Sequence, residues 1–300
     1  MPANQENVVK KIENDEIKHL SSICFCLEDT IEDDYLEDAE RILKNILEKL
    51  MTIDKLPLIF IRIRNPEHLI KIHKFIGECE SIVCGYVLPK FDLNNIDDYI
   101  GIIKELTKEK LIYFMPILES RDIANCALRR NVLLEIYKKI KEVEKYILNI
   151  RVGANDLCNI FGLRRKANQT IYDVGVVRDA LIDILSVFSP EYVVSGPVCE
   201  YIDNGNYNWD LPLKSELELD VLNGFLGKTC IHPSQLPYVF NSLKVEASQY
   251  NDAIRILNWV NKEVAVEKST ESDRMNEKKC SINWANKIKM LAEIYGVKEW

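Results

Sequence analysis

Short runs of β-branched and aromatic residues alternate along this chain with longer amphipathic segments. The runs lie at 23–28, 58–64, 82–88, 111–118, 146–152, 192–195 and 225–231. The segments between them, at 34–51, 67–78, 96–107, 123–144, 174–188 and 215–223, carry apolar residues at helical spacing with charges on the opposite side. Strands that alternate with helices form a parallel sheet covered by helices. The pattern therefore predicts an α/β fold, and 300 residues are enough to close it into one TIM (β/α)8-type barrel.

The two ends of the chain depart from this pattern. An eight-stranded barrel needs one more strand, and the opening Met1-Pro2-Ala3 leads directly into a charged, helix-like segment at 6–19. We expect a barrel that lacks its first strand or is clipped there, with a short disordered leader as the alternative. The predicted domains are a catalytic barrel at 1–261, a polar linker at 262–280 and an amphipathic C-terminal helix at 281–300, which serves as a lid or subunit contact.

Composition excludes several functional classes. Asp and Glu total 47 against 39 Lys and Arg, a net charge of −8, so we expect no nucleic-acid partner. No window has the roughly 18 apolar residues of a membrane span, and no signal-peptide segment opens the chain, so we expect no membrane partner and a cytoplasmic location. The nine cysteines include several in apolar runs and form no paired zinc motif, which indicates reduced thiols.

The strand ends supply a set of charged and polar candidates. Reactive groups of a parallel barrel lie at the carboxyl ends of its strands. Here these positions hold Glu28, Asp29, Arg62, Arg64, Lys90, Glu119, Asn155, Asp156, Lys228 and His232. Glu119 and Asp156 end adjacent strands, so both carboxylates can reach one Mg²⁺, which takes one or two carboxylates and leaves its other positions to water and substrate. Mn²⁺ is the alternative ion.

The remaining candidates suit an anionic substrate. Glu28 and Asp29 can accept hydrogen bonds from waters on the ion. Arg62 and Arg64 alternate with isoleucines and so point to one face, where they bind a substrate carboxylate or enolate oxygen, or pair with the acids of the first strand. We expect Lys90 to act similarly rather than to form a Schiff base, because nearby carboxylates keep it protonated. Further substrate contacts are expected from three residues: Asn155, Lys228 and His232.

Six of these strand-end runs resemble a known family. They are Leu27-Glu28-Asp29, Ile61-Arg62-Ile63-Arg64-Asn65-Pro66, Leu88-Pro89-Lys90, Pro116-Ile117-Leu118-Glu119-Ser120, Val152-Gly153-Ala154-Asn155-Asp156-Leu157 and Gly227-Lys228-Thr229-Cys230-Ile231-His232-Pro233. In this order they resemble the citrate lyase beta-subunit-like branch of the HpcH/HpaI aldolases. The opening Met1-Pro2-Ala3 also resembles the turn after that family's first strand.

The resemblance implies a Mg²⁺-dependent carbon-carbon lyase on a TIM barrel, acting through a metal-stabilised enolate on an oxo-acid or an acyl-CoA thioester. It implies that Glu119 and Asp156 are the metal ligands and that Arg62 holds the oxyanion and carboxylate. Glu28 and Asp29 would hold water around the ion. The expected reaction is a retro-aldol or retro-Claisen cleavage, or the reverse condensation, in a homo-oligomeric enzyme.

Departures from the family pattern leave the substrate open. Cys26 and Asn155 stand where the family has acidic residues, and the segment 161–173 resembles a subgroup associated with tellurium-resistance genes. The basic run 164–166 either recruits a phosphate or carboxylate or is a solvated loop. One alternative function is a CoA-independent aldolase for pyruvate- or oxaloacetate-type acids. Another is a non-catalytic, metabolite-binding barrel in a stress-response system.

Overall fold

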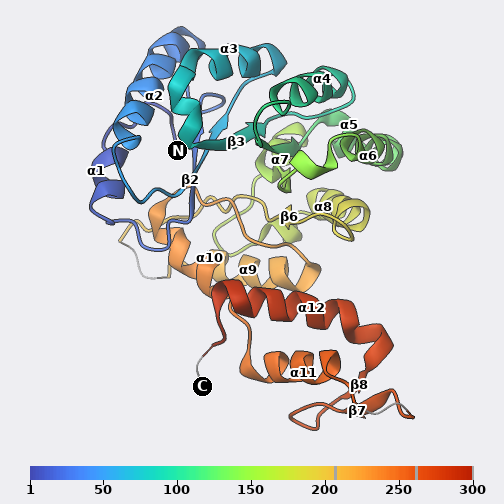
Figure 1. Ribbon diagram of the computed structural model, residues 1–300. Coiled ribbons are helices and arrows are strands. Elements are labelled where there is room, and N and C mark those ends of the chain that lie inside the picture. Colours follow the sequence, from blue (N-terminus) through green and yellow to red (C-terminus); the bar gives the residue numbers. More distant parts are fainter. Residues whose placement is uncertain (206–207, 261–262, 299–300) are drawn as a thin grey trace. The chain divides into compact units, whose positions relative to one another are not determined.

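The computed structural model describes residues 1–205, 208–260 and 263–298 (Figure 1). The chain divides into two compact units, Met1–Leu236 and Pro237–Trp300. The boundary therefore comes before residue 261, where the sequence pattern placed the end of the barrel domain.

The first unit is built on a parallel sheet of six strands in chain order. The strands are β1 (Ser22–Cys26), β2 (Leu58–Arg62), β3 (Val83–Leu88), β4 (Tyr113–Leu118), β5 (Ile150–Val152) and β6 (Val194–Ser195). Each strand pairs with the next, as Cys26 does with Arg62 and Ile117 with Arg151. Parallel neighbours need a long crossover between them, and helices provide it. The predicted alternation of parallel strands and helices is confirmed.

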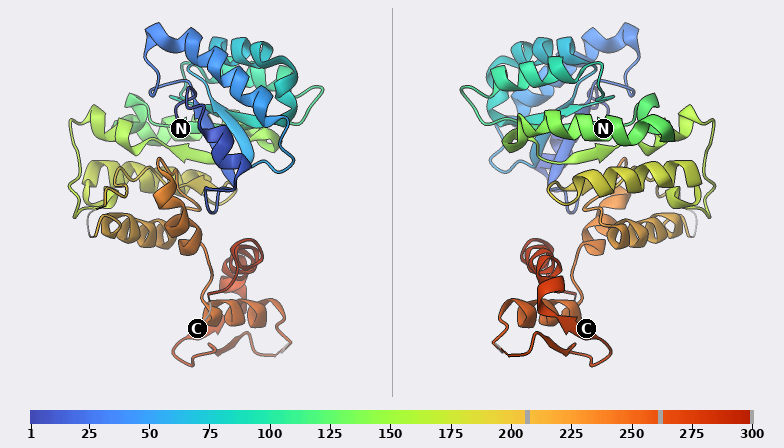
Figure 2. Two further views of the ribbon diagram at one scale, coloured as in Figure 1. Left: turned by 90° about the vertical axis from the view of Figure 1, so that its left-hand side faces the viewer. Right: turned by 90° about the vertical axis from the view of Figure 1, so that its right-hand side faces the viewer.

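Helices surround this sheet on the outside (Figures 1 and 2). They are α1 (Val8–Glu13), α2 (Leu36–Leu50), α3 (Pro66–Ile76), α4 (Ile96–Leu106), α5 (Arg121–Ala124), α6 (Cys126–Lys141), α7 (Ala154–Ile160), α8 (Gly175–Phe188) and α9 (Leu211–Asn223). The helix expected at 123–144 is two helices, because the Asn125 side chain accepts a hydrogen bond from the Ala127 N–H at 3.0 Å and caps the second one. Helix α7 was not predicted.

Short β-bridges extend the sheet beyond β1 and β6. Beside β1, the Cys26 N–H donates to the Met1 carbonyl at 2.8 Å, and Pro2 forms a parallel bridge with Cys26. Beside β6, the strand expected at 225–231 is reduced to a bridge between Gly196 and Lys228. Gly227, which directly precedes this bridge, has a φ of 72°, a left-handed conformation that interrupts extended backbone.

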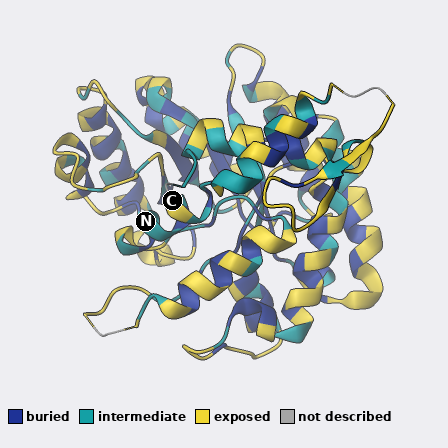
Figure 3. Cartoon of the chain, turned by 90° about the horizontal axis from the view of Figure 1, so that it is seen from below, coloured by how far each residue is buried: buried dark blue, intermediate teal, exposed yellow. Residues whose placement is uncertain are grey.

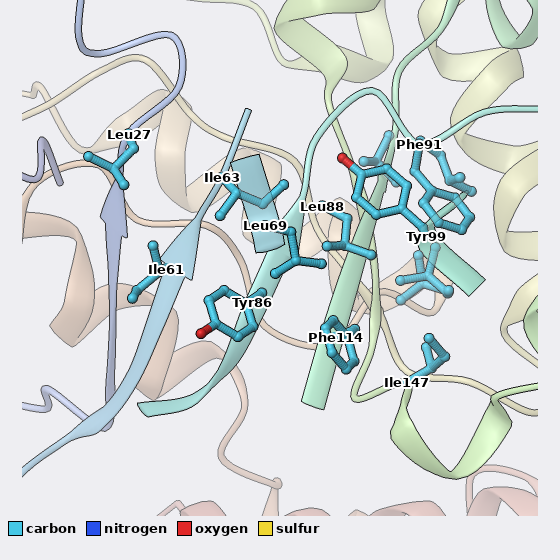
Figure 4. Packing of buried hydrophobic residues seen from close by; sticks show 14 of the residues in the cluster. Leu27, Ile61, Ile63, Leu69, Tyr86, Leu88, Phe91, Tyr99, Phe114 and Ile147 are labelled. Atoms are coloured by element: carbon cyan, nitrogen blue, oxygen red, sulfur yellow. The ribbon is translucent and has the colours of Figure 1, made fainter. Parts of the chain in front are cut away.

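The two faces of the strands pack against different partners, because side chains alternate along a strand. One face meets the helices in a large core, and Figure 4 shows Ile61, Tyr86 and Phe114 from successive strands in this layer. The opposite face forms a smaller apolar cluster of Phe60, Val87, Met115 and Ile117, with Cys24 packed against it. Along the helices, buried positions turn toward the strands and exposed ones away (Figure 3). Full burial of each large apolar side chain contributes about 1.5–3 kcal/mol.

The second unit has a small core of its own. Its elements are α10 (Leu236–Ser242), α11 (Ala247–Leu257), β7 (Val266–Lys268), β8 (Met275–Glu277) and α12 (Lys278–Tyr295). Apolar residues of α11 and α12, among them Ile256 and Ile288, pack together. None of the helices within the described ranges has the length and apolar character needed to cross a membrane.

The segment expected to be a polar linker, 262–280, instead contains the antiparallel pair β7-β8 and the first residues of α12. Buried Asp252 of α11 accepts hydrogen bonds from the Thr270 N–H and hydroxyl, both at 2.6 Å. This contact fixes the turn between the two strands, which explains how such a polar sequence is ordered. Residues 261, 262, 299 and 300 lie outside the described residues.

Candidate active site

Successive strand ends bring charged side chains to one edge of the sheet in the first unit. Glu28 and Asp29 follow β1, Arg62 ends β2, Lys90 follows β3 and Glu119 follows β4. Ion pairs and hydrogen bonds connect these five residues, so their predicted convergence is observed. Glu28 and Glu119 are almost fully buried, which sets them apart from ordinary surface acids.

Arg62 and Lys90 hold the two acids that follow β1. Arg62 forms an ion pair with Glu28, and its Nη2 lies 3.0 Å from Asp29 Oδ2. Lys90 Nζ lies 2.9 Å from Glu28 Oε1 and 3.4 Å from Asp29 Oδ1. Each cation therefore contacts both carboxyl groups, and the four side chains form one charge-balanced cluster.

The two acids of this cluster differ in proton affinity. Burial raises the pKa of Glu28 although Arg62 opposes the change. Burial also acts to raise the pKa of Asp29, but its hydrogen bond with Glu28 and the charges of Arg62 and Lys90 outweigh this effect and lower it. The hydrogen bond to Glu28 raises the pKa of Lys90, so its amine is an ammonium rather than a nucleophile. This agrees with the expectation that Lys90 forms no Schiff base.

Glu119, which follows β4, is closely surrounded by backbone atoms of neighbouring segments. Its side chain is 3% exposed, and its Oε1 accepts a hydrogen bond from the Lys90 N–H at 2.8 Å. Lys90 donates from a left-handed backbone conformation, with a φ of 48°. A Cβ atom at Gly153 would lie 1.8 Å from Glu119 Oε2 and 2.6 Å from Glu119 Cβ, so only glycine leaves room for this carboxyl group.

Glu119 also interacts electrostatically with Asp156, which lies in the first turn of α7. Burial, and then the charge of Asp156, raise the pKa of Glu119 to about 8. Two neighbouring carboxylates in a buried site repel each other unless a proton or a cation neutralises them. The charges of the two predicted metal ligands thus interact.

The donor set fits a hard divalent cation. Carboxylate oxygens are the ligands that Mg²⁺ prefers, and one or two of them suffice because waters and substrate complete the octahedron. Within the described parts of the chain, no group of three or more His, Cys, Asp and Glu has metal-binding geometry.

Arg64 does not join this cluster, although the sequence pattern placed it beside Arg62 as a substrate contact. Its Nε donates to the Leu27 carbonyl at 2.8 Å, and its other nitrogens contact the Ile31 carbonyl and Asp33. Arg64 thus holds the loop after β1. Arg64 lies beyond the end of β2, so the alternation of side chains along the strand no longer determines its direction.

Lys228, also expected to bind substrate, is instead part of a buried ion network. Its side chain is 1% exposed, and its Nζ lies 2.8 Å from Glu216 Oε1 and 2.7 Å from Asp220 Oδ2, both on α9. Arg165 and Tyr172 complete this network through Glu216 and Asp220. Lys228 therefore joins the last bridge of the sheet to α9, and its buried ammonium pairs with two carboxylates of the protein.

The other two predicted contacts lie at the surface. His232 is exposed, and its Nδ1 accepts a hydrogen bond from the Ser234 N–H at 3.2 Å, which caps a short 3-10 turn. Asn155 is exposed next to Asp156 and lines a cavity of about 160 Å³ with residues that include Arg164 and Glu200. A larger surface cavity, of about 530 Å³, lies between α1 and α2, away from these strand ends.

Arg151 on β5 also lies near the site but was not predicted from the sequence. It pairs in register with Ile117, and its Nη2 donates to the Thr229 hydroxyl. Its charge interacts with Arg62 and Glu119. The available signal was a lone arginine between Ile150 and Val152, in a strand expected to be buried on both faces.

Comparisons with known proteins agree with this architecture. The model of the family described as "C-C_Bond_Lyase of the TIM-Barrel fold" matches residues 1–297. The chain is similar to the solved structure of the protein CitE from Mycobacterium tuberculosis in complex with magnesium, acetoacetate and coenzyme A, with a TM-score of 0.65 and 18% identity over 98% of this chain and 96% of that one. It is also similar to the Haloferax volcanii malate synthase magnesium/glyoxylate complex, with a TM-score of 0.56 and 10% identity over 92% and 81%.

No curated protein sequence matches the chain significantly. At these low identities the two solved structures show a shared fold. Together with the family match, they confirm the predicted TIM-barrel class.

Proposed function

This chain belongs to the C-C bond lyases of the TIM-barrel fold, and from that premise we propose a Mg²⁺-dependent enzyme that cleaves or forms a carbon-carbon bond beside a carbonyl group. Glu119 and Asp156 would hold the ion. Arg62 would bind the substrate oxygen on which negative charge develops, and Glu28 with Asp29 would hold water around the ion.

The surroundings of Glu119 carry this proposal. A carboxyl group that is 3% exposed and repelled by a second carboxylate is costly for a protein unless it has a use. The chain nevertheless provides a backbone donor at Lys90 and a side-chain-free position at Gly153 for it. A divalent cation would neutralise the repulsion and favour the ionised form of Glu119, which is the form that binds metal.

When bound, the ion would supply Lewis acidity toward the substrate carbonyl. In the cleavage direction, the bond between the α-carbon and a neighbouring carbinol carbon breaks, and its electron pair forms an enolate. The carbinol hydroxyl loses its proton as the second carbonyl forms, and the enolate carbon takes up a proton. Arg62, held by Glu28 and Asp29, donates charge-assisted hydrogen bonds to the enolate oxygen, a contribution of about 3 kcal/mol to the transition state.

The similar structures and the charged cluster support a proposal for the substrate class. One similar protein is in complex with acetoacetate and coenzyme A, and the other with glyoxylate, both with magnesium. We therefore propose an oxo-acid or an acyl-CoA thioester, as for a citrate lyase beta-like enzyme. A CoA-independent aldolase differs in being saturated by free oxo-acids. Within the basic run, Arg164 is exposed and lines the cavity near Asn155, where it could meet a phosphate, whereas Arg165 is buried against Glu216.

Other expectations stay predictions. They are a cytoplasmic homo-oligomer, use of Mn²⁺ in place of Mg²⁺, a lid or subunit-contact role for the C-terminal helix, and membership of the tellurium-resistance-associated subgroup. A non-catalytic, metabolite-binding role is the main competitor, and the retained acid pair of Glu119 and Asp156 argues against it.

Exchange of α-protons for deuterium tests the proposal without knowledge of the full substrate. Pyruvate and acetyl-CoA are incubated in D₂O with Mg²⁺ or with a chelator and followed by NMR. We expect Mg²⁺-dependent exchange of at least one compound, reduced about a hundredfold or more in Glu119→Gln and Asp156→Asn. Asp179→Asn, a change of an exposed carboxylate on α8, is the control that keeps activity. Exchange that persists in both site variants, or needs no metal, would refute the mechanism.

A further inference from the structure

A buried histidine lies between two helices of the first unit, α2 and α3. His68, in the first turn of α3, is 6% exposed, and Glu40 of α2, beside it, is 4% exposed. The His68 Nε2 lies 3.0 Å from Glu40 Oε1, and Lys71 Nζ lies 2.7 Å from Glu40 Oε2. Buried polar side chains are costly unless their polar atoms have partners, so the contacts of this ring show what it is held for.

Hydrogen bonds determine which nitrogen of the His68 ring carries the proton. The Arg64 N–H donates to Nδ1 at 3.1 Å, so Nδ1 is an acceptor and carries no hydrogen. Burial lowers the pKa of His68 although the charge of Glu40 opposes the change, so the ring is neutral and its hydrogen is on Nε2, which donates to Glu40. Glu40 therefore holds the ring in place, and the ring in turn holds the backbone of Arg64.

The Arg64 side chain connects this histidine to the loop after β1. Its Nε donates to the Leu27 carbonyl at 2.8 Å, and its Nη2 donates to the Ile31 carbonyl. Glu28 and Asp29, the two acids of the charged cluster, lie between these two carbonyls in the chain. The Ile31 N–H donates to the Glu28 carbonyl at 2.9 Å, so this stretch forms a compact turn. A displacement of Arg64 would therefore displace the backbone on both sides of the acids.

We infer that His68 is a positioning residue of the active site, which acts through Arg64 to fix the loop that carries Glu28 and Asp29. The inference rests on the proposed function for the role of these acids, which is to hold Arg62 and the water around the ion. His68 acts from outside the charged cluster, at one remove from ion and substrate. Groups that orient the residues around a metal commonly change activity when they are replaced. The competing explanation is a purely structural link between α2 and α3.

Asparagine and glutamine separate the two sides of the ring. The amide oxygen of Asn reaches the position of Nδ1, so His68→Asn keeps an acceptor for the Arg64 N–H and loses the Glu40 contact. The longer Gln reaches the position of Nε2, so His68→Gln keeps the Glu40 contact and loses the acceptor. Each change removes one hydrogen bond of the ring, so the two should lower the urea midpoint to a similar extent. Asn65→Ala weakens the start of the same helix and leaves the partners of the ring in place, so it is the control for lost stability.

Two measurements on the full chain report on the loop and on the chemistry separately. Amide hydrogen exchange, followed by mass spectrometry, reports opening of the segment 27–33. Deuterium exchange of α-protons with Mg²⁺, on whichever of pyruvate and acetyl-CoA the parent exchanges, reports turnover. In His68→Gln the segment should exchange at least about tenfold faster and the turnover number should fall about tenfold, with the Michaelis constant within about threefold of the parent. His68→Asn and Asn65→Ala should keep loop protection and turnover within about threefold of the parent.

Arg64→Lys tests the connection between the histidine and the loop. Its backbone N–H still meets His68, but an ammonium lacks the guanidinium fork that contacts both loop carbonyls, so segment 27–33 should again exchange about tenfold faster. Equal loop exchange in His68→Gln and His68→Asn, or unchanged loop exchange in Arg64→Lys, would overturn the inference, as would a turnover number that follows the urea midpoint in every variant. A parent without Mg²⁺-dependent α-proton exchange would instead count against the proposed function, and amide exchange of the loop would then decide whether His68 positions it.

Discussion

Removal of the charge on Glu119 should change how stability of the metal-free protein depends on pH. Burial and Asp156 raise the pKa of Glu119 from 4.5 to about 8. The difference of about 3.5 corresponds to about 5 kcal/mol at 1.36 kcal/mol per pKa unit. Water that enters the site on ionisation reduces this figure, so we expect an effect on the order of 2–5 kcal/mol. The folded protein keeps a proton that the unfolded chain loses, so stability is full below about pH 4.5 and falls as the pH rises to about 8.

Urea unfolding between about pH 5 and about pH 9 measures this loss, with a chelator or with Mg²⁺. The parent should lose stability relative to Glu119→Gln as the pH rises, because glutamine cannot ionise. Mg²⁺ should restore stability to the parent at high pH and have little effect on the variant. Glu105→Gln, at an exposed site on α4, is the matched control. Parallel pH profiles for the parent and Glu119→Gln would refute the reasoning.

Three further substitutions test the structure around the site. Gly153→Ala should displace Glu119, weaken Mg²⁺ binding by tenfold or more in calorimetry and lower stability by about 1–3 kcal/mol; unchanged metal affinity would contradict this. Lys228→Met should leave buried Asp220 without a cation and buried Glu216 with Arg165 as its cation, and lower the free energy of unfolding by about 3–5 kcal/mol, whereas loss of an exposed substrate-binding lysine would cause almost no change in urea. Asn65→Ala removes a cap that accepts the His68 N–H at 2.8 Å, and thermal unfolding should show a loss of about 1 kcal/mol without loss of exchange activity.

The elements of the first unit could be predicted because periodicity determines which side chains are buried. The helix expected at 34–51 is α2, Leu36–Leu50, and the strand expected at 82–88 is β3, Val83–Leu88. The structure of the segments at 225–231 and 262–280 could not be predicted from periodicity. The polar stretch at 262–280 gives no apolar signal for β7 and β8, because a single buried carboxylate, Asp252, orders their turn. The run at 225–231 looks like a strand, but Gly227 breaks it.

Part of the site could be predicted from topology alone. Parallel strands place their carboxyl ends together, so the cluster of Glu28, Arg62 and Glu119 follows from strand order. Side-chain direction was harder to predict. Lys228 lies within an apolar run, yet its side chain points toward α9, because it pairs there with Glu216 and Asp220. Arg151 was overlooked because it lies within a strand and not at its end.

Binding of one divalent ion by Glu119 and Asp156 is the central claim, and electron paramagnetic resonance titration with Mn²⁺ tests it most directly. The account predicts one Mn²⁺ site that Mg²⁺ displaces, that is lost in both Glu119→Gln and Asp156→Asn, and that persists in Asp179→Asn. Mn²⁺ binding of unchanged affinity in the two site variants would contradict the account.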